Sequence, residues 1–329
     1  MSEPDSRSRL LAMIGAVLIA AATALLPGGA AAEGWRDGTP MTTARAYAGA
    51  ALLGDDLYVI GGGGISGPRS MTEIYDTVGD IWRAAAALPV GLQQFGIAVS
   101  GGKIYVAGGY SARGTRDERI EEESDNLWIF DPAVGTWISG APMPSSRVAL
   151  GLAAAGGKLY AIGGKGPDAG RVFVYSPETE RWAVAAASMP APRSDLALAV
   201  IGDEIFVIGG HEGKAATPRV DIFDTARQTW RPGPALPSPR EGHVAAVLDG
   251  RIHVTGGESL SPPRSYADHF VLDAKGGAWG RAAPLPTPRH AAVAAVAHGR
   301  LFVIGGSPGA GVYTVFTQSD VVDIYSPDK

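Results

Sequence analysis

A pair of glycines that ends a short apolar run occurs six times along the chain, and this repeat limits the possible folds more than any other feature. The six segments are LYVIGG, IYVAGG, LYAIGG, IFVIGG, IHVTGG and LFVIGG, which end at Gly62, Gly109, Gly164, Gly210, Gly257 and Gly306. The pairs are 47, 55, 46, 47 and 49 residues apart. A steady period of this length indicates an architecture in which each repeat is one supersecondary unit.

Other residues keep the same register within each repeat. An aromatic or apolar residue lies seven positions before a tryptophan in the pairs Tyr75/Trp82, Phe130/Trp137, Tyr175/Trp182, Phe223/Trp230 and Leu272/Trp279. In most repeats an arginine follows ten or eleven positions later and precedes the next Gly-Gly pair by sixteen. Apolar runs bounded by turn residues are typical of strands, and each repeat holds four of them. The sequence therefore predicts an all-β fold, a six-bladed β-propeller with four antiparallel strands in each blade.

The two ends of the chain complement each other. After Tyr325 a tryptophan would be due at position 332, but the sequence ends at Lys329. Trp35 lies ten residues before Arg45, which is also the offset from Trp230 to Arg240. We therefore expect residues 33–40 to form the fourth strand of the last blade and to close the ring without an open sheet edge. The propeller would cover residues 33–329, with blades at about 41–87, 88–140, 141–187, 188–234, 235–283, and 284–329 with 33–40.

The Gly-Gly pair, the Tyr-x6-Trp pair and the preceding Pro-x-x-Arg resemble the kelch repeat, and the resemblance covers residues 33–329. Kelch propellers serve as scaffolds, as ligand binders and as a few enzymes, so the resemblance implies the fold more than the function. One kelch-type enzyme, galactose oxidase, needs a copper site with a Cys–Tyr crosslink. Because the chain has no cysteine, it cannot form that cofactor.

The first 32 residues differ from the repeats. Arg7 and Arg9 precede an uncharged run from Leu10 to Leu26, and Ala30-Ala31-Ala32 has the pattern of a cleavage site. Such a segment is typical of a secretory signal peptide, so we expect residues 1–32 to direct export to the periplasm or the cell exterior. The alternative is an uncleaved segment that would anchor the protein to a membrane.

Composition excludes several classes of function. The formal net charge is −5 and no long basic tract is present, so nucleic acid is not expected as a partner. The chain has no phosphate-binding glycine loop that opens a helix, and its six histidines lack metal-ligand spacing. We therefore expect neither a cofactor nor a metal site.

The order of the strands places two kinds of loop on one face of the predicted ring. The first strand of a blade starts after the arginine, and the second returns to the Gly-Gly pair, so the loops at both marks share a face. From the second glycine to the mark on the third strand the interval varies between 11 and 21 residues, whereas the turns on the opposite face are short. Variable loops on a rigid scaffold concentrate binding residues, so we expect the site on this face.

The recurring arginines are the first candidates for ligand binding: Arg45, Arg147, Arg193, Arg240 and Arg289. Leu92 holds this place in the second blade. Guanidinium groups around the mouth of a central channel would suit a carboxylate, an acidic sugar or an acidic peptide. The resemblance implies the same, since arginines at this position line the pocket of kelch propellers that bind acidic peptides. The alternative is that each arginine binds backbone carbonyls and fixes its own blade.

Residues beside the arginines and directly after Gly-Gly should share that mouth. We take Tyr110, His243 and His290 as further ligand-binding candidates, and Glu258, Glu241 and His211 as candidate general acids or bases. The alternative for each is a solvated residue at the rim. The charged segment 110–126 is a candidate contact for another protein, or else a solvated loop.

Three functions stay open at this point. The first is an exported binding module for an anionic small molecule, a glycan or an acidic protein segment. The second is an enzyme resembling the exported kelch-type sialic acid mutarotases, in which arginine would hold the sugar carboxylate and Glu258, Glu241 or His211 would move the proton. The third is a scaffold for protein–protein contacts through residues 110–126.

Overall fold

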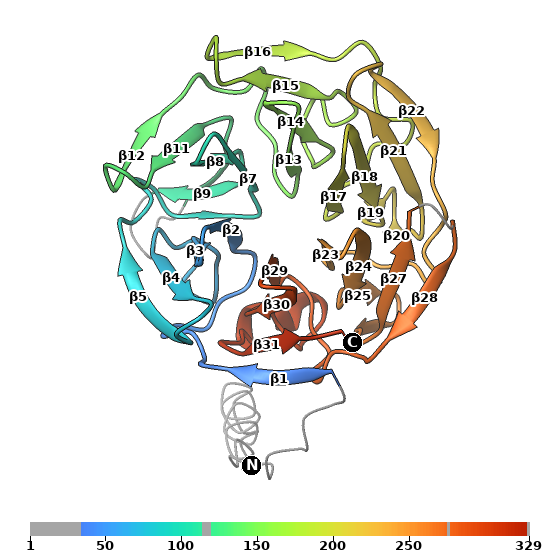
Figure 1. Ribbon diagram of the computed structural model, residues 1–329. Coiled ribbons are helices and arrows are strands. Elements are labelled where there is room, and N and C mark those ends of the chain that lie inside the picture. Colours follow the sequence, from blue (N-terminus) through green and yellow to red (C-terminus); the bar gives the residue numbers. More distant parts are fainter. Residues whose placement is uncertain (1–33, 114–119, 275–276, 328–329) are drawn as a thin grey trace, which may run out of the picture. The chain divides into compact units, whose positions relative to one another are not determined.

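The computed structural model describes residues 34–113, 120–274 and 277–327. Over these residues six four-stranded antiparallel sheets surround a central axis as the blades of a propeller (Figure 1). The six-bladed all-β fold predicted from the repeats is thus confirmed. No helix in this part of the chain is long and apolar enough to cross a membrane.

Each blade contributes one strand to each of four concentric positions. The innermost strands are β2 (Gly49–Leu53), β7 (Gly96–Ser100), β13 (Gly151–Ala155), β17 (Ala197–Ile201), β23 (Val244–Leu248) and β29 (Val293–Ala297). The second strands are β3 (Asp56–Ile60), β8 (Lys103–Ala107), β14 (Lys158–Ile162), β18 (Glu204–Ile208), β24 (Arg251–Thr255) and β30 (Arg300–Ile304). The third strands are β4 (Thr72–Asp76), β11 (Leu127–Asp131), β15 (Phe173–Ser176), β21 (Val220–Asp224), β27 (His269–Asp273) and β31 (Val322–Tyr325). The outer strands are β5 (Ile81–Ala85), β12 (Thr136–Ser139), β16 (Arg181–Val184), β22 (Thr229–Pro232), β28 (Trp279–Ala282) and β1 (Trp35–Gly38).

The outer strand of the last blade comes from the other end of the chain. Strand β1 pairs antiparallel with β31, and Trp35 stands opposite Tyr325 as Trp82 stands opposite Tyr75 in the first blade. This confirms the predicted closure of the ring. Because β1 covers the free edge of β31, the last blade has the same four strands as the others.

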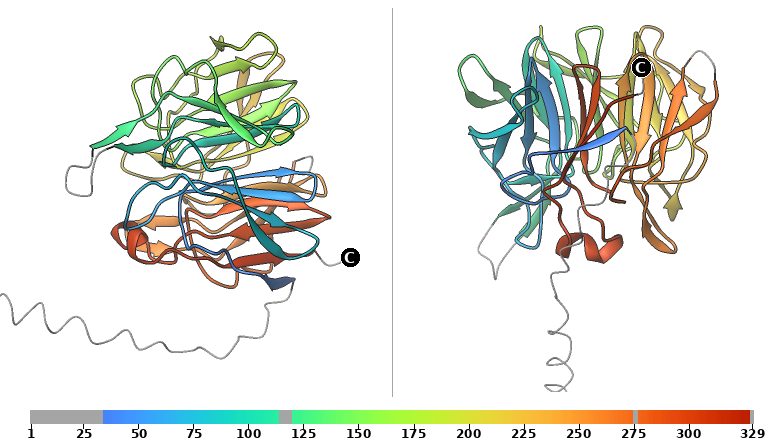
Figure 2. Two further views of the ribbon diagram at one scale, coloured as in Figure 1. Left: turned by 90° about the vertical axis from the view of Figure 1, so that its left-hand side faces the viewer. Right: turned by 60° about the horizontal axis from the view of Figure 1, so that its bottom comes forward.

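The two faces of the ring differ in their connections. Two-residue turns join the first and second strands of every blade on one face. The longer segments between the second and third strands, here called the loop face, lie on the other: β6 (Leu92–Gln93), β9 (Tyr110–Arg113), β10 (Ile120–Glu123), β19 (His211–Glu212), β20 (Ala215–Ala216), β25 (Glu258–Leu260), β26 (Pro263–Ser265) and the 3-10 helix η1 (Gly311–Phe316). In the right-hand view of Figure 2, η1 projects from the lower side of the ring.

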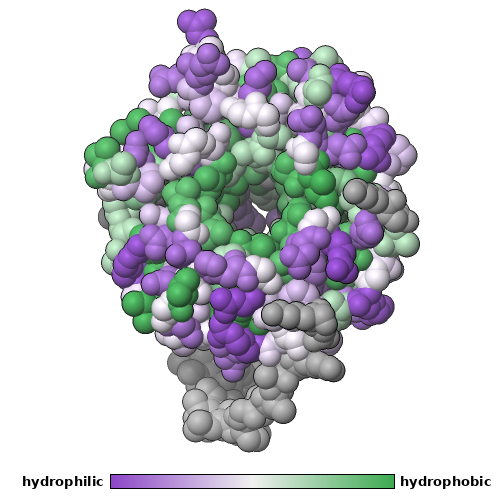
Figure 3. Space-filling view, viewed as in Figure 1, coloured by the Kyte–Doolittle hydropathy of each residue, from purple (hydrophilic) through white to green (hydrophobic). Residues whose placement is uncertain are grey.

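The channel wall between the two faces is apolar. Its lining includes Ala50, Ile97, Leu152, Leu198 and Ala294 around a cavity of about 260 Å³. Figure 3 shows hydrophobic residues around the central opening on the face opposite η1. Polar chemistry at the axis is therefore confined to the ends of the channel.

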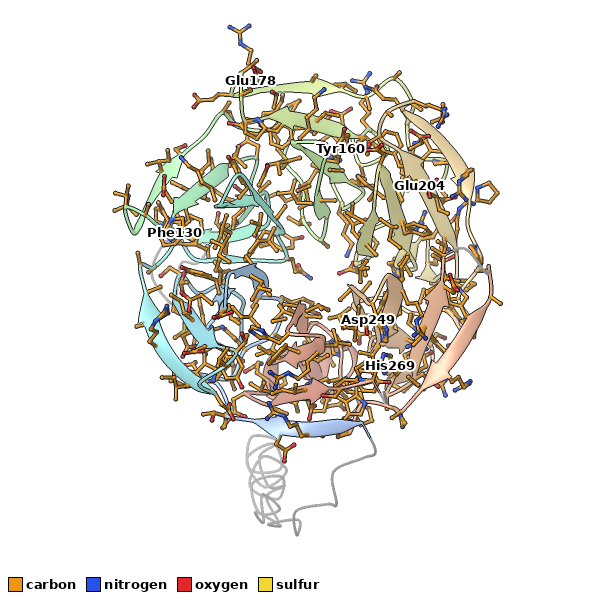
Figure 4. The ribbon with its side chains drawn as sticks, viewed as in Figure 1. Phe130, Tyr160, Glu178, Glu204, Asp249 and His269 are labelled. Atoms are coloured by element: carbon orange, nitrogen blue, oxygen red, sulfur yellow. The ribbon has the colours of Figure 1, made fainter. Side chains whose placement is uncertain are left out.

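Aromatic residues fill the space between neighbouring blades. The ring of Tyr58 lies 5.6 Å from that of Phe130, and Figure 4 shows Phe130 and His269 inside the ring of blades. His253 replaces the tyrosine or phenylalanine of the other second strands, and its Nδ1 lies 2.9 Å from Nε2 of His269. Both imidazoles are buried.

The Gly-Gly pairs have a steric cause. Gly61 and Gly62 have φ of 58° and 89°, which disfavours residues with a Cβ. A Cβ at Gly61 would lie 2.6 Å from the carbonyl oxygen of Leu92, and one at Gly62 would lie 2.8 Å from that of Ala46. The repeat thus marks the place where one blade turns against the next.

Candidate functional site

A closed ring of backbone hydrogen bonds frames the channel opening on the loop face. One residue of each blade takes part, and its N–H donates to the carbonyl of its counterpart in a neighbouring blade at 2.7 to 3.2 Å. The six residues, here called the mouth ring, are Tyr47, Gln94, Ala149, Asp195, Gly242 and Ala291. All have φ between 52° and 60°. The ring fixes the inner edge of the mouth and directs three polar side chains, those of Tyr47, Gln94 and Asp195, to positions beside it.

A second layer of the mouth is formed by cross-loop pairs. The residue after each arginine mark pairs with the residue after the Gly-Gly pair, as in the bridges Ser194–His211, Glu241–Glu258 and His290–Ser307. The structure thus brings together the two sets of positions that the sequence placed at the mouth. The polar pairs are concentrated in the fourth, fifth and sixth blades, so the mouth is chemically asymmetric.

Three carboxylates dominate this side of the mouth: Asp195, Glu241 and Glu258. Glu241 binds Nδ1 of His211. Asp195 has Nζ of Lys165 at 3.3 Å. Oε2 of Glu258 accepts a hydrogen bond from the Gly311 N–H at 2.7 Å, and its Oε1 lies 3.3 Å from Nε2 of His290. No arginine or lysine among the described residues is within ion-pair distance of Glu241 or Glu258.

Burial makes these carboxyl groups difficult to ionise. Glu258 is 6% exposed, and burial together with the charges of Glu241 and Asp195 raises its pKa to about 7. Burial also raises the pKa of Glu241, although the bond to His211 opposes this shift. The pKa of Tyr47 is raised by burial and by the same carboxylates. These mutual effects show that the groups share one electrostatic environment around the opening.

Helix η1 covers one side of the mouth. Its buried residue Thr314 has Oγ1 at 2.9 Å from Nε2 of His290. Burial lowers the pKa of His290 to about 4, so the imidazole is neutral at physiological pH. A cavity of about 200 Å³ opens between η1 and the first two blades, lined in part by Tyr47, Gln93 and Thr314.

The five arginines lie inside the blades rather than at the surface of the mouth. Each is at most 2% exposed. Arg193 donates to the carbonyls of Val207 and Gly209 at 2.9 and 2.7 Å, and Arg289 donates to the matching carbonyls of Val303 and Gly305 at 3.0 and 2.9 Å. The prediction that these guanidiniums face the opening is therefore corrected. The alternative, in which each arginine fixes its own blade, describes the geometry.

Each guanidinium also has a partner on the third strand of its blade. In three blades the partner is a buried acid: Arg45 with Glu73 at 2.5 Å, Arg193 with Asp221 at 2.8 Å and Arg289 with Asp323 at 2.5 Å. In two blades an aromatic ring takes the equivalent place, with Phe173 3.9 Å from Arg147 and Phe270 4.7 Å from Arg240. The acid or aromatic two residues before the strand mark is the signal that sequence reasoning missed.

The remaining candidates lie in different environments. His243 is buried against Gly209, and burial together with Arg240 lowers its pKa to about 3. It contributes to the wall of a small cavity of about 110 Å³ behind the mouth ring. Tyr110 pairs with Gln93 at the rim of the second blade, away from the acidic blades. Of the segment 110–126, positions 114–119, which include Arg116, lie outside the described residues. No group of three or more possible metal ligands occurs in the described part of the chain.

Comparisons with known proteins identify the repeats. The family model described as the KLHDC2/KLHL20/DRC7 Kelch-repeats domain matches residues 149–325, and the Kelch motif matches residues 44–89 and 92–144. Kelch-like protein 23 of Homo sapiens is 27% identical over 208 residues, which cover 62% of this chain and 36% of that protein. Kelch-like protein 35 of Mus musculus is 30% identical over 221 residues, or 66% of this chain and 35% of that protein. The aligned part thus spans about a third of these relatives.

A solved structure shows the same architecture. The chain described as "Structure of YjhT" superposes with a TM-score of 0.76 at 18% identity, covering 88% of this chain and 97% of that chain. At this identity the likeness shows the propeller fold.

Proposed function

The chain belongs to the kelch-repeat family, and we propose that it is a binding module whose ligand presents a positively charged group to the mouth on the loop face. The observation that carries the proposal is the set of Asp195, Glu241 and Glu258 around one opening. Partly buried carboxylates without a matching cation are unfavourable, and a cation supplied by a ligand would relieve that cost.

The arrangement of the three acids supports recognition of a cation rather than a purely structural role. In the blades themselves, buried acids such as Asp323 have arginine partners at ion-pair distance. At the mouth, Glu241 and Glu258 have histidine partners instead, and the pKa of His290 is lowered to about 4. The neutral imidazole of His290 leaves the negative charge of an ionised Glu258 uncompensated.

A calorimetric titration with charge-matched small molecules tests the proposal. Arginine amide and glucosamine serve as cationic probes, and glucuronate and sialic acid serve as anionic ones. We expect the cationic probes to bind the wild-type protein, and the double variant E241Q/E258Q to weaken them at least tenfold. The matched control is E178Q, because Glu178 lies on the outer side of the ring (Figure 4). Equal binding by wild type and E241Q/E258Q would refute the proposal.

The anionic ligand, glycan or acidic peptide expected from the sequence is the rival within the same experiment. With the five arginines buried, an anion at the mouth would depend on Lys165, whose side chain is 55% exposed. Preferential binding of glucuronate or sialic acid, lost in Lys165→Ala, would support the rival.

An enzymatic function has one specific observation in its favour. The carboxyl group of Glu258, with a pKa of about 7 and Nε2 of His290 at 3.3 Å, matches what a general acid or base needs near neutral pH. A mutarotase acting on a carboxylated sugar would use this group to move the proton. Proton NMR of sialic acid anomer exchange tests this alternative, and an exchange rate unchanged by the protein would eliminate it.

Export through residues 1–32 is part of the proposal, and this segment lies outside the described residues. The alanines at positions 30–32 support cleavage before Glu33. Mass spectrometry of the protein recovered from the exported fraction should give an N-terminus at Glu33. A full-length protein in the membrane fraction would support the anchored alternative.

A further inference from the structure

Large apolar side chains are exposed together on the loop face beside the acidic mouth. Four of the six residues of η1 are exposed, with Val312 at 79%, Tyr313 at 64%, Val315 at 42% and Phe316 at 67%. Two residues of neighbouring loops extend this surface, Leu260 at 44% and Ile65 at 69%. We call these six residues the η1 patch.

Contacts show that the patch is continuous. A Cβ built on Gly311, at the start of η1, would lie 3.6 Å from Cδ2 of Leu260. Ile65 and Val315 line the same cavity of about 200 Å³ between the first and last blades. In Figure 2, η1 projects from the ring into the solvent. Contiguous exposed apolar surface of this kind marks interaction sites in soluble proteins.

The patch is joined directly to the acidic mouth. The Gly311 N–H donates to Oε2 of Glu258 at 2.7 Å, and Oγ1 of Thr314 lies 2.9 Å from Nε2 of His290. Helix η1 is thus held by its polar groups, while its apolar side chains point away from the blades. A ligand bound at Glu258 would pass next to these side chains.

We propose that the η1 patch and the acidic mouth together form a docking site for a peptide segment of a partner protein, in which a lysine or arginine is flanked by large apolar residues. The inference rests on the proposed function, because the basic side chain would occupy the cation position near Glu241 and Glu258. The apolar neighbours would cover η1 and Leu260, and one of them would enter the cavity beside Ile65.

Charge complementarity decides between possible occupants. A membrane surface also takes exposed aromatic and aliphatic side chains, but anionic lipid headgroups would meet the carboxylates of Asp195, Glu241 and Glu258. A partner with a positive charge next to its apolar groups removes this conflict and satisfies both halves of the surface. The peptide therefore fits where an anionic bilayer does not.

Fluorescence anisotropy with designed heptapeptides tests this inference. The probes carry a central lysine, arginine, serine or glutamate, flanked on both sides by leucine and phenylalanine. We expect the lysine and arginine peptides to bind wild type at least tenfold more tightly than the glutamate peptide. Two independent patch variants, V312S/F316S and Y313S/V315S, should each weaken the lysine peptide at least fivefold.

A control separates the patch from general surface hydrophobicity. V134S/I138S removes two apolar side chains of similar exposure, 70% and 55%, at the outer part of the second blade. This variant should bind the lysine peptide as wild type does. Thermal melting of all variants should coincide within a few degrees, since each change is at a solvent-exposed side chain.

The outcomes distinguish this inference from the proposed function. If arginine amide binds through Glu241 and Glu258 while both patch variants bind the lysine peptide like wild type, the cation site stands and the docking site is refuted. Absence of binding by all four peptides also refutes it. Patch-dependent flotation with phosphatidylcholine/phosphatidylglycerol vesicles, or patch-dependent dimerisation in light scattering, would assign the surface to another occupant and overturn it.

Discussion

The indole N–H of Trp35 donates to the carbonyl oxygen of Ala283 at 2.8 Å, and this bond ties the last blade to the fifth. The same bond recurs at the other junctions: Trp82 to Thr39, Trp137 to Ala86, Trp182 to Ala141, Trp230 to Ala187 and Trp279 to Pro234. A residue from the start of the chain thus completes a ring of equivalent contacts, which makes β1 an integral strand of the propeller.

Replacing Trp35 with alanine should destabilise the ring strongly. Trp35 is 3% exposed and packs against His269 and Tyr325, so the change removes a large buried side chain and its hydrogen bond. We expect the free energy of unfolding in urea to fall by about 3–5 kcal/mol. W137A, at a half-buried tryptophan, should cost less, and an equal loss in both variants would contradict the special role of closure.

The arginines should differ in their contribution to stability according to their partners. R289L leaves the carboxylate of Asp323 buried without its partner, so we expect a loss of about 3–5 kcal/mol. R147L should cost about 1–3 kcal/mol, because Phe173 stands where the other blades have an acid. Denaturation curves measure both, and R289L/D323L should recover part of the loss. The prediction fails if R147L is as damaging as R289L.

Acid should destabilise the protein through its buried histidines. Burial lowers the pKa of His243 to about 3 and those of His253, His269 and His290 to about 4, from an ordinary value of 6.5. Because the unfolded chain binds protons first, stability is complete above about pH 6.5 and falls as the pH drops toward 4. H253F, which restores the residue type of the other blades, should flatten this dependence. Melting temperatures at pH 7, 6 and 5 provide the measurement.

The mouth ring offers a substitution that separates binding from folding. Asp195 has φ of 53°, and Gly242 holds the equivalent place in the next blade. D195G should therefore leave stability unchanged or slightly higher, since glycine adopts this conformation without strain. The same variant should weaken cationic probes by removing one of the three carboxylates. Unaltered affinity for arginine amide would show that Asp195 takes no part in the site.

The repeat register predicted the architecture well because it follows from local requirements that recur in each blade. Gly-Gly marks a positive-φ turn, and Trp marks a bond to the neighbouring blade, so the position of Trp35 could be read from its offset to Arg45. The register also predicted that Glu241 and Glu258 share the mouth, which their backbone bridge now shows.

The ligand chemistry was not predictable in the same way. The arginines look alike in the sequence whether they face a channel or a carbonyl, and their direction depends on partners such as Asp323 on a distant strand. Helix η1 lies in an inter-strand segment without the repeat, so its exposed Phe316 has no counterpart in other blades from which to infer its place. The burial that raises the pKa of Glu258 depends on that helix, since Gly311 closes over the carboxylate.

The central claim is that the mouth holds buried carboxylates that a cation would stabilise, and carbon-13 NMR of labelled glutamate side chains tests it most directly. The Glu258 resonance, assigned with E258Q, should titrate with a pKa of about 7 in the free protein instead of the ordinary 4.5. Saturating arginine amide should lower that pKa, because a bound cation favours the ionised form. A Glu258 pKa near 4.5, or a raised value that arginine amide leaves unchanged, would contradict the account.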